Sequence, residues 1–309
     1  MTEYPSQNWR DYELIDCGDG EKLERFGRFT MVRPEPKAIW AKTLPNEEWM
    51  KLAHTRFSPG AGFGKAGKED SGTWDRLKKM EDQWHIIYPG LQKGLEFDLR
   101  LGLTSFKHVG VFPEQAPNWE FIYARTAELA SKAKAAGANP PRVLNLFAYT
   151  GAASLAAKAA GADVTHLDSV RQVVTWARGN METSGLDGIR WVVEDAMKFA
   201  KREAKRGNRY SGIILDPPAY GHGPDGERWK LDDCLFELLQ NVAQILEPKD
   251  SFMVLNLYSN GYSALLGETV VREAFKLKGT GYTLESGELA LRDRFGKDLP
   301  LSIVVRLTR

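Results

Sequence analysis

Apolar strands alternate with amphipathic helices through the second half of the chain, and this alternation limits the possible folds more than any other feature of the sequence. Strands that are joined by helices form parallel sheets with helices on both faces. The final two apolar runs have no helix between them, which predicts an antiparallel hairpin at or near the sheet edge. The runs are RVLNLFA, ADVTHLD, IRWVVED, GIILD and SFMVLNLY, from residues 142, 162, 189, 212 and 251, then YTLESGELAL and LSIVVRLTR, from residues 282 and 301.

The first hundred residues follow a different pattern, in which short apolar runs alternate with turn residues. Asp19-Gly20 stands between two such runs, which predicts a β-hairpin. A helix is expected to start at Pro45, and strands are expected at Trp84–Pro89 and Leu95–Gly102. The segment Ser58–Gly72 is rich in glycine and lysine and predicts a mobile surface loop. This part of the chain therefore predicts a β-rich region.

The change of pattern predicts two domains, as the length of 309 residues also does. We expect a smaller β-rich α+β domain over residues 1–110, with a role in substrate recognition, and an α/β domain over residues 111–309. A helix is expected from about Ile122 to Ala136, close behind this boundary.

Composition excludes several classes of protein. The 42 basic and 41 acidic residues nearly cancel, so net charge gives no evidence for a nucleic-acid binder. No apolar run approaches the roughly 18 residues of a membrane span, and the N-terminus lacks a signal-peptide pattern, so we expect a cytoplasmic protein. Cys17 and Cys234 are far apart and indicate neither a disulfide framework nor a metal site.

Three of the four helix-linked strands that begin at residues 142 to 212 end in aspartate, at Asp168, Asp195 and Asp216. Ligands of open α/β sheets bind beyond the carboxyl ends of the strands. One such aspartate is more often only a helix cap, but three together indicate a ligand site. Asp168 lies 17 residues beyond Gly151, close to the spacing of about 20 that is typical of a ribose-binding carboxylate. Asp195 would then lie near an adenine ring.

The turn after the strand that begins at residue 142 indicates which nucleotide is bound. It contains one glycine, Gly151, and places the bulky Phe147 and Tyr149 where a pyrophosphate needs bare backbone. A dinucleotide is therefore disfavoured, and an adenosine-type ligand without phosphates is preferred.

A second informative stretch begins at Asp216. Pro217 and Pro218 fix the backbone and lack amide donors, so the Asp216 carboxylate and the loop carbonyls can accept hydrogen bonds from an amino group. The alternative is a rigid loop without a role in binding.

These motifs, taken in order, resemble the class I S-adenosylmethionine-dependent methyltransferases. The closest resemblance is to the bacterial branch that includes large-subunit ribosomal RNA methyltransferases with an added N-terminal domain. It covers about residues 109–309 and implies a seven-stranded Rossmann-like sheet, S-adenosylmethionine as the cofactor and RNA as a partner. The motifs are LFAYTG (146–151), HLD (166–168), WARGN (176–180), EDAMKF (194–199) and ILDPPAYG (214–221).

Site residues follow from the strand ends and from this resemblance. The cofactor-binding candidates are Asn145, Phe147, Tyr149, Thr150, Gly151, Ala152, Asp168, Ser169, Asp195 and Ala196, with Phe112 and Gln115 from the segment HVGVFPEQAPNW. The catalytic candidates are Asp216, Pro217, Pro218 and Tyr220. No metal site is expected.

The acceptor atom is expected to be a base nitrogen. Methylation of pyrimidine carbon-5 normally needs a cysteine that adds to the base first, and Leu255–Gly261, where related enzymes carry it, has none. Tyr220 is a candidate face for a flipped base, although Ala219 displaces it by one residue. His222 is a further candidate base, but an exposed loop histidine is the more common case.

Other functions stay open on the sequence alone. The basic run Lys198–Arg209 has helical spacing and is more often a solvated face than an RNA site. The acceptor can instead be a protein or a small molecule. Two further alternatives are a nicotinamide-dependent oxidoreductase, which the missing G-x-G-x-x-G disfavours, and a non-catalytic RNA-binding protein that retains the fold.

Overall fold

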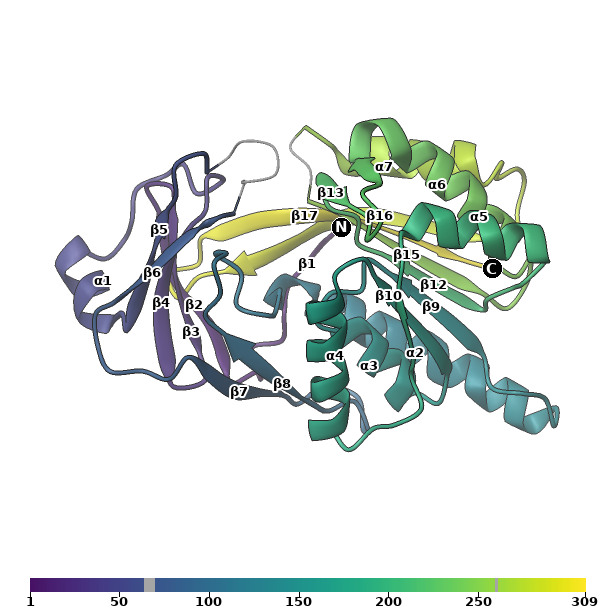
Figure 1. Ribbon diagram of the computed structural model, residues 1–309, viewed down its shortest axis with the longest axis horizontal. Coiled ribbons are helices and arrows are strands. Elements are labelled where there is room, and N and C mark those ends of the chain that lie inside the picture. Colours follow the sequence, from purple (N-terminus) through teal and green to yellow (C-terminus); the bar gives the residue numbers. More distant parts are fainter. Residues whose placement is uncertain (64–69, 259–260) are drawn as a thin grey trace.

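Eight strands form the central sheet in the computed structural model, which describes residues 1–63, 70–258 and 261–309 (Figure 1). Their spatial order is β1 (Thr2–Glu3), β16 (Thr283–Arg292), β17 (Asp298–Thr308), β15 (Phe252–Leu257), β12 (Gly212–Leu215), β9 (Arg142–Leu146), β10 (Asp163–Asp168) and β11 (Arg190–Val193). The strands β15, β12, β9, β10 and β11 are parallel, and β17 is antiparallel to both β15 and β16. The predicted doubly wound α/β sheet with its C-terminal hairpin is confirmed, and β1 adds a short eighth strand.

Helices cover both faces of this sheet (Figure 1). One face carries α2 (Ala116–Ala135), α3 (Ala152–Ala159) and α4 (Arg171–Thr183), and the other carries α5 (Ala196–Arg206), α6 (Leu231–Ile245) and α7 (Ala264–Ala274). Successive residues of β9 point to opposite faces: Val143 joins the core beneath α2 and α3, and Leu144 joins the core beneath α5 and α6. This is why the strands read as continuous apolar runs in the sequence.

The helix α2 begins six residues before the predicted start at Ile122, at Ala116, directly after the short helix η1 (Pro113–Gln115). The predicted start was therefore too late, and the helix includes Pro117 in its first turn. In the first turn a proline costs little, since the amide that it lacks would have no partner inside the helix.

The N-terminal part contains a five-stranded sheet and a separate hairpin. The sheet runs in chain order through β2 (Tyr12–Gly18), β3 (Glu21–Phe26), β4 (Phe29–Pro34), β5 (Thr55–Pro59) and β6 (Gly72–Arg76), the hairpin joins β7 (Gln83–Tyr88) to β8 (Phe97–Gly102), and α1 spans Asn46–Leu52. The predicted turn at Asp19-Gly20 is confirmed, with φ angles of 51° and 75° that match the twist of a two-residue hairpin.

The predicted loop Ser58–Gly72 is shorter than expected. Its ends belong to β5 and β6, which pair antiparallel with Ser58 opposite Thr73 and Pro59 opposite Gly72. Residues 64–69, the centre of the predicted loop, lie outside the described residues.

The C-terminal hairpin reaches from the central sheet to the N-terminal strands (Figure 1). At its tip, the Lys297 ammonium donates to the Asp16 carboxylate at 2.8 Å and to the Cys17 carbonyl at 2.7 Å. Residues of both parts share one hydrophobic core that includes Met31 of β4 and Leu301 of β17. The division at residues 110 and 111 stays a prediction, because the chain crosses between the parts again at this hairpin.

Candidate functional site

A cavity lies at the carboxyl ends of β9, β12 and β15, against η1 and the start of α2. Its lining brings together side chains from segments that are far apart in the sequence, as parallel strands do. Nine of the sixteen predicted site residues line it, namely Phe112, Gln115, Asn145, Phe147, Tyr149, Thr150, Gly151, Ala152 and Asp216.

The turn after β9 is strained. Phe147 and Tyr149 adopt left-handed backbone conformations with φ angles of 56° and 48°, and Gly151 follows at 95°. For a residue with a Cβ atom this conformation costs roughly 1 to 2 kcal/mol, and such strain gathers at ligand sites. A Cβ atom on Gly151 would lie 3.0 Å from the Cβ of Ala177 in α4. The glycine therefore allows the close approach of α4.

Asp168 ties the end of β10 to this turn. Its carboxylate accepts hydrogen bonds from the backbone N–H groups of Tyr149 and Val170, both at 3.0 Å. Burial raises the pKa of Asp168, and backbone hydrogen bonds oppose this rise. Asp168 does not line the cavity, nor does its half-buried neighbour Ser169. Ribose binding by Asp168 stays a prediction, although the carboxylate adjoins the turn.

Asp195 has the role of a helix cap. Its side chain accepts a hydrogen bond from the Lys198 backbone N–H at 2.8 Å and caps α5, whose first residue is the buried Ala196. Adenine contact by these two residues stays a prediction, and neither lines the cavity.

Asp216 stands at the end of β12, in the wall of the cavity. The Asn256 side-chain amide donates to its carboxylate at 2.8 Å and is itself fixed by the Ser302 hydroxyl, which donates to the Asn256 carbonyl oxygen at 2.9 Å. Burial raises the pKa of Asp216 to about 7, and the negative charge of Glu114 adds to this effect. This carboxylate can therefore gain or lose a proton near neutral pH.

The catalytic role of Pro217 and Pro218 stays a prediction. The Pro218 carbonyl accepts a hydrogen bond from the Trp229 indole N–H at 2.7 Å, so this oxygen already has a donor. Pro217 is buried, whereas Pro218 is exposed. Neither proline lines the cavity.

Tyr220 starts the strand β13 (Tyr220–His222), which pairs with β14 (Arg228–Lys230). The Tyr220 side chain is 43% exposed and does not line the cavity. His222, at the other end of β13, is exposed, as expected of a loop histidine.

Sequence reasoning missed two polar residues beside the cavity. The Tyr258 hydroxyl, just beyond β15, donates to Glu114 Oε1 at 2.9 Å and accepts from the Gln115 amide at 3.0 Å. Glu114 is buried, and its Oε2 atom has no hydrogen-bond partner among the described residues. The signals were a glutamate inside the segment HVGVFPEQAPNW and a tyrosine at a strand end.

Three buried polar side chains, those of Asn145, Ser154 and His166, are connected to one another next to this turn. The Asn145 amide donates to the Ser154 hydroxyl at 2.9 Å, and that hydroxyl lies 3.0 Å from His166 Nδ1. Burial lowers the pKa of His166 to about 3, so the imidazole is neutral. Asn145 therefore combines a place in the cavity wall with a structural contact.

Neither cysteine lines the cavity. Cys17 of β2 is buried against the tip of the C-terminal hairpin, and this burial raises the pKa of its thiol to about 12. Cys234 lies within α6. Within the described ranges, no group of three or more His, Cys, Asp or Glu side chains is suited to hold a metal ion. The helices in those ranges include none that is long and apolar enough to cross a membrane.

The basic run on α5 is largely paired with acidic side chains. Lys198 forms an ion pair with Asp225 at 3.3 Å, and Lys201 forms one with Glu237 at 2.7 Å. These pairs support the interpretation of this helix face as a solvated surface.

Comparisons with known proteins agree with this geometry. A family model for S-adenosylmethionine-dependent methyltransferases matches residues 69–286, more than half of the chain. The S-adenosylmethionine-dependent methyltransferase from Agrobacterium tumefaciens is 36% identical, with a TM-score of 0.86 over 99% of this chain and 92% of that one. SMU.776, a methyltransferase solved with S-adenosylhomocysteine, shares the fold at 16% identity, with a TM-score of 0.71 over 98% and 76% of the two chains.

Among curated proteins, the ribosomal RNA large subunit methyltransferase K/L of Pseudoalteromonas atlantica is 27% identical over 268 residues. This match covers 81% of this chain and 35% of that protein, so the chain spans about a third of that relative's length. The predicted family and cofactor are confirmed: the chain belongs to the S-adenosylmethionine-dependent methyltransferases.

Proposed function

We propose that this protein transfers a methyl group from S-adenosylmethionine to a base nitrogen of ribosomal RNA. The observation that carries the proposal is the Asp216 carboxylate, which faces the cavity, has one side-chain donor and has a pKa of about 7. A carboxylate in this state accepts a hydrogen bond from an amino group and can take up its proton near neutral pH. The name of the curated relative from Pseudoalteromonas atlantica supports large-subunit ribosomal RNA as the substrate.

The residues around the turn after β9 fit the cofactor. The sulfonium of S-adenosylmethionine supplies an activated methyl group, and the protein has to hold donor and acceptor in line. In this proposal the turn 147–152 packs under the methionine part, with Phe112 and Gln115 opposite it. Asp168 and Ser169 bind the ribose, and Asp195 with Ala196 borders the adenine.

Nitrogen is the better acceptor because the site lacks a nucleophilic thiol. Carbon-5 of a pyrimidine requires a cysteine that adds to the ring. The high pKa of the buried Cys17 thiol disfavours thiolate formation, and Cys234 lies within α6. An amine nucleophile needs only orientation and a proton acceptor, which Asp216 provides.

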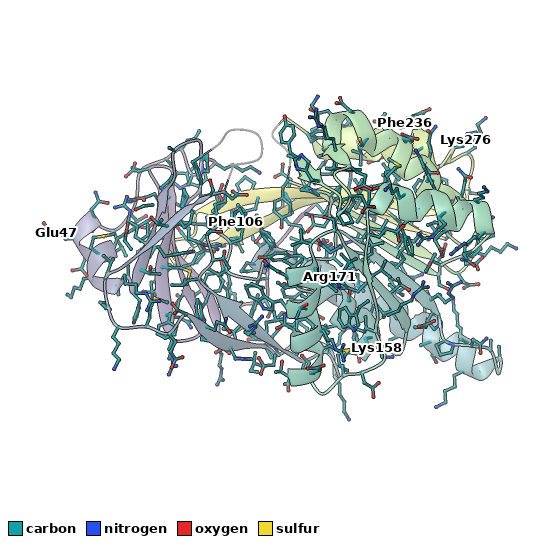
Figure 2. All side chains as sticks on the ribbon, in the orientation of Figure 1. Glu47, Phe106, Lys158, Arg171, Phe236 and Lys276 are labelled. Atoms are coloured by element: carbon teal, nitrogen blue, oxygen red, sulfur yellow. The ribbon has the colours of Figure 1, made fainter. Side chains whose placement is uncertain are left out.

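RNA as the partner has support from the N-terminal part. Phe106 lies between the N-terminal strands and the central sheet (Figure 2) and is 51% exposed. Exposed aromatic rings are typical of protein surfaces on which unpaired bases stack.

Calorimetry with S-adenosylhomocysteine tests the cofactor half of the proposal. Asp168→Ala should weaken binding about tenfold to a hundredfold, because a hydrogen bond to a charged group contributes about 1.5 to 3 kcal/mol. Asp163→Ala, at the exposed start of the same strand, is the matched control and should bind like the wild type. Equal affinity of the wild type and Asp168→Ala would contradict the assignment.

The acceptor half is tested by mass spectrometry of nucleosides from the ribosomal RNA of a deletion strain and its parent. One methylated base should be missing in the deletion strain. The wild-type gene should restore it, whereas a gene for Asp216→Asn should not. An unchanged nucleoside profile would instead indicate a protein or a small molecule as the acceptor.

A further inference from the structure

Tyr258 directly follows β15, and its partly exposed side chain is held in place by several contacts. Its hydroxyl donates to the buried Glu114 carboxylate and accepts from the Gln115 amide, at 2.9 and 3.0 Å. The ring itself packs against Phe112, with the centroids 5.5 Å apart. Two hydrogen bonds and one ring contact therefore fix both the position and the plane of this side chain.

The order of the strands places Tyr258 on the acceptor side of the site. Apart from Phe112 and Gln115, which come from the segment around η1, the proposed cofactor contacts lie at or just beyond the ends of β9, β10 and β11, whereas Asp216 follows β12 and Tyr258 follows β15. Since β12 separates β15 from β9 in the sheet, Tyr258 lies beyond Asp216 as seen from the cofactor. Asn256, on the strand that Tyr258 follows, donates a hydrogen bond to the Asp216 carboxylate at 2.8 Å and so joins the two strand ends.

A row of aromatic rings connects the two sides. Phe112 contacts Tyr149 of the turn at 5.4 Å between centroids and Tyr258 at 5.5 Å. Phe112 and Tyr149 line the cavity, and Tyr258 extends the row beyond it. Bases stack on such rings because every base has a π-face.

Tyr220 lacks these features. It is 43% exposed on β13, and among the described residues its ring makes no aromatic contact. An unsupported exposed ring loses conformational entropy when it stacks, whereas a ring that is already fixed loses less.

We propose that Tyr258, fixed by Glu114 and Gln115, is the aromatic face against which the acceptor base stacks beside Asp216. The inference rests on the proposed RNA function and specifies its acceptor subsite. It assigns to Tyr258 the stacking role that the sequence assigned to Tyr220. Glu114 is a positioning residue, because it acts through the Tyr258 hydroxyl.

The test measures methyl transfer from radiolabelled S-adenosylmethionine to large-subunit ribosomal RNA from a deletion strain, together with S-adenosylhomocysteine binding. Tyr258→Leu removes the ring, and Tyr258→Gln also removes it but keeps a donor for Glu114. Tyr258→Phe keeps the ring and removes the hydroxyl. Tyr123→Leu is the matched control. Like Tyr258, Tyr123 is partly exposed and its hydroxyl donates a hydrogen bond, in this case to the Lys93 carbonyl, but Tyr123 does not line the cavity.

We expect Tyr258→Leu and Tyr258→Gln to raise the KM for RNA about tenfold to a hundredfold, the range that corresponds to loss of one base–aromatic stack. Affinity for S-adenosylhomocysteine should stay within threefold, which also shows that the variants fold. Tyr258→Phe should raise KM only several-fold, and Tyr123→Leu should leave it unchanged.

Two results would overturn the inference while the RNA function stands. One is an unchanged KM in both ring-less variants. The other is a tenfold or greater loss of S-adenosylhomocysteine affinity in both, which would make Tyr258 a cofactor contact. A wild-type chain that transfers no methyl group to this RNA would refute the RNA function itself, and the inference with it.

Discussion

Two carboxylates in this molecule, the fully buried Asp16 and the half-buried Asp216 in the cavity wall, have opposite surroundings. At the tip of the C-terminal hairpin, the fully buried Asp16 accepts four hydrogen bonds from N–H groups and one from the Lys297 ammonium. Burial raises the pKa of Asp16, but the bonds from Lys297, Leu44, Trp49 and Thr43 outweigh it and lower the pKa overall. In the cavity, burial raises the pKa of Asp216 to about 7.

The difference separates a structural carboxylate from one that is available for chemistry. A fully bonded carboxylate joins the segments that supply its donors and stays ionised. Asp216 has one side-chain donor, from Asn256, so lone pairs remain for a ligand. The number of donors around a buried acid is therefore a better guide to its role than its burial.

The largest effect is expected from Asp16→Ala. This change leaves the N–H groups of Cys17, Thr43, Leu44 and Trp49 without their acceptor. Each buried unsatisfied donor costs about 1 to 3 kcal/mol, so the free energy of unfolding should fall by roughly 4 kcal/mol or more, as measured by urea denaturation. Asp16→Asn keeps one acceptor oxygen, so its free energy of unfolding should fall clearly less than that of Asp16→Ala. Equal losses in the two variants would contradict the structural role assigned to the hydrogen bonds of Asp16.

Asp216→Asn should lower activity and raise stability, whereas Asp16→Ala should lower stability. We expect kcat to fall about a hundredfold or more, the range typical of a lost proton acceptor. The native state binds a proton on Asp216 between about pH 4 and pH 7 that the unfolded state has already released, so this group destabilises the wild type as pH rises through that window. The variant should therefore gain stability relative to the wild type between pH 4 and 7 and keep that gain above pH 7. Thermal unfolding at pH 5 and pH 8 measures this.

Asn256→Ala removes the side-chain donor to Asp216 and should shift the pH dependence of methyl transfer. Activity of the wild type should rise with pH around a midpoint near 7, because the ionised form of Asp216 is the active one. Losing a hydrogen bond to the ionised carboxylate, worth about 1.5 to 3 kcal/mol, should move that midpoint upward by about 1 to 2 pH units. Ser302→Ala, one bond further away, is the control and should move it less.

The smallest effect is expected from an exposed ion pair. Arg28 and Glu81 pair on the surface with side chains that are 66% and 57% exposed. Arg28→Ala should change the free energy of unfolding by less than about 0.5 kcal/mol. If Arg28→Ala lost as much stability as Asp16→Ala in the same urea titration, a carboxylate with one exposed partner would matter as much as one with five. The number of hydrogen-bond donors would then not distinguish a structural carboxylate from other carboxylates.

Much of the site could be predicted from the sequence because parallel strands end at one edge of a sheet. That rule placed Asp216 and the turn after β9 in one cavity without any knowledge of distances. The rule could not assign roles. An aspartate at a strand end can bind a ligand or cap the next helix, and the Asp195 side chain caps α5. Nor could it find the contact of Tyr258 with Glu114, which spans 144 residues of sequence.

The parts of the fold that were missed depend on partners rather than on local pattern. The two residues of β1 form a strand because β16 offers its edge, and no periodicity exists in so short a run. The left-handed conformations of Phe147 and Tyr149 contradict the preference of their residue type. Surrounding structure imposes them, so the sequence carries no local sign of them.

The bond between Lys297 and Asp16 also constrains the order in which the molecule can be completed. The two residues are 281 positions apart, so the N-terminal sheet is synthesised long before the Lys297 ammonium that pairs with Asp16. Until the hairpin arrives, Asp16 and the apolar residues around it lack part of their final environment, and exposed strands in such intermediates are prone to aggregate. A chain stalled before residue 297 is thus expected to need chaperone protection for its N-terminal sheet, although those strands left the synthesis machinery first.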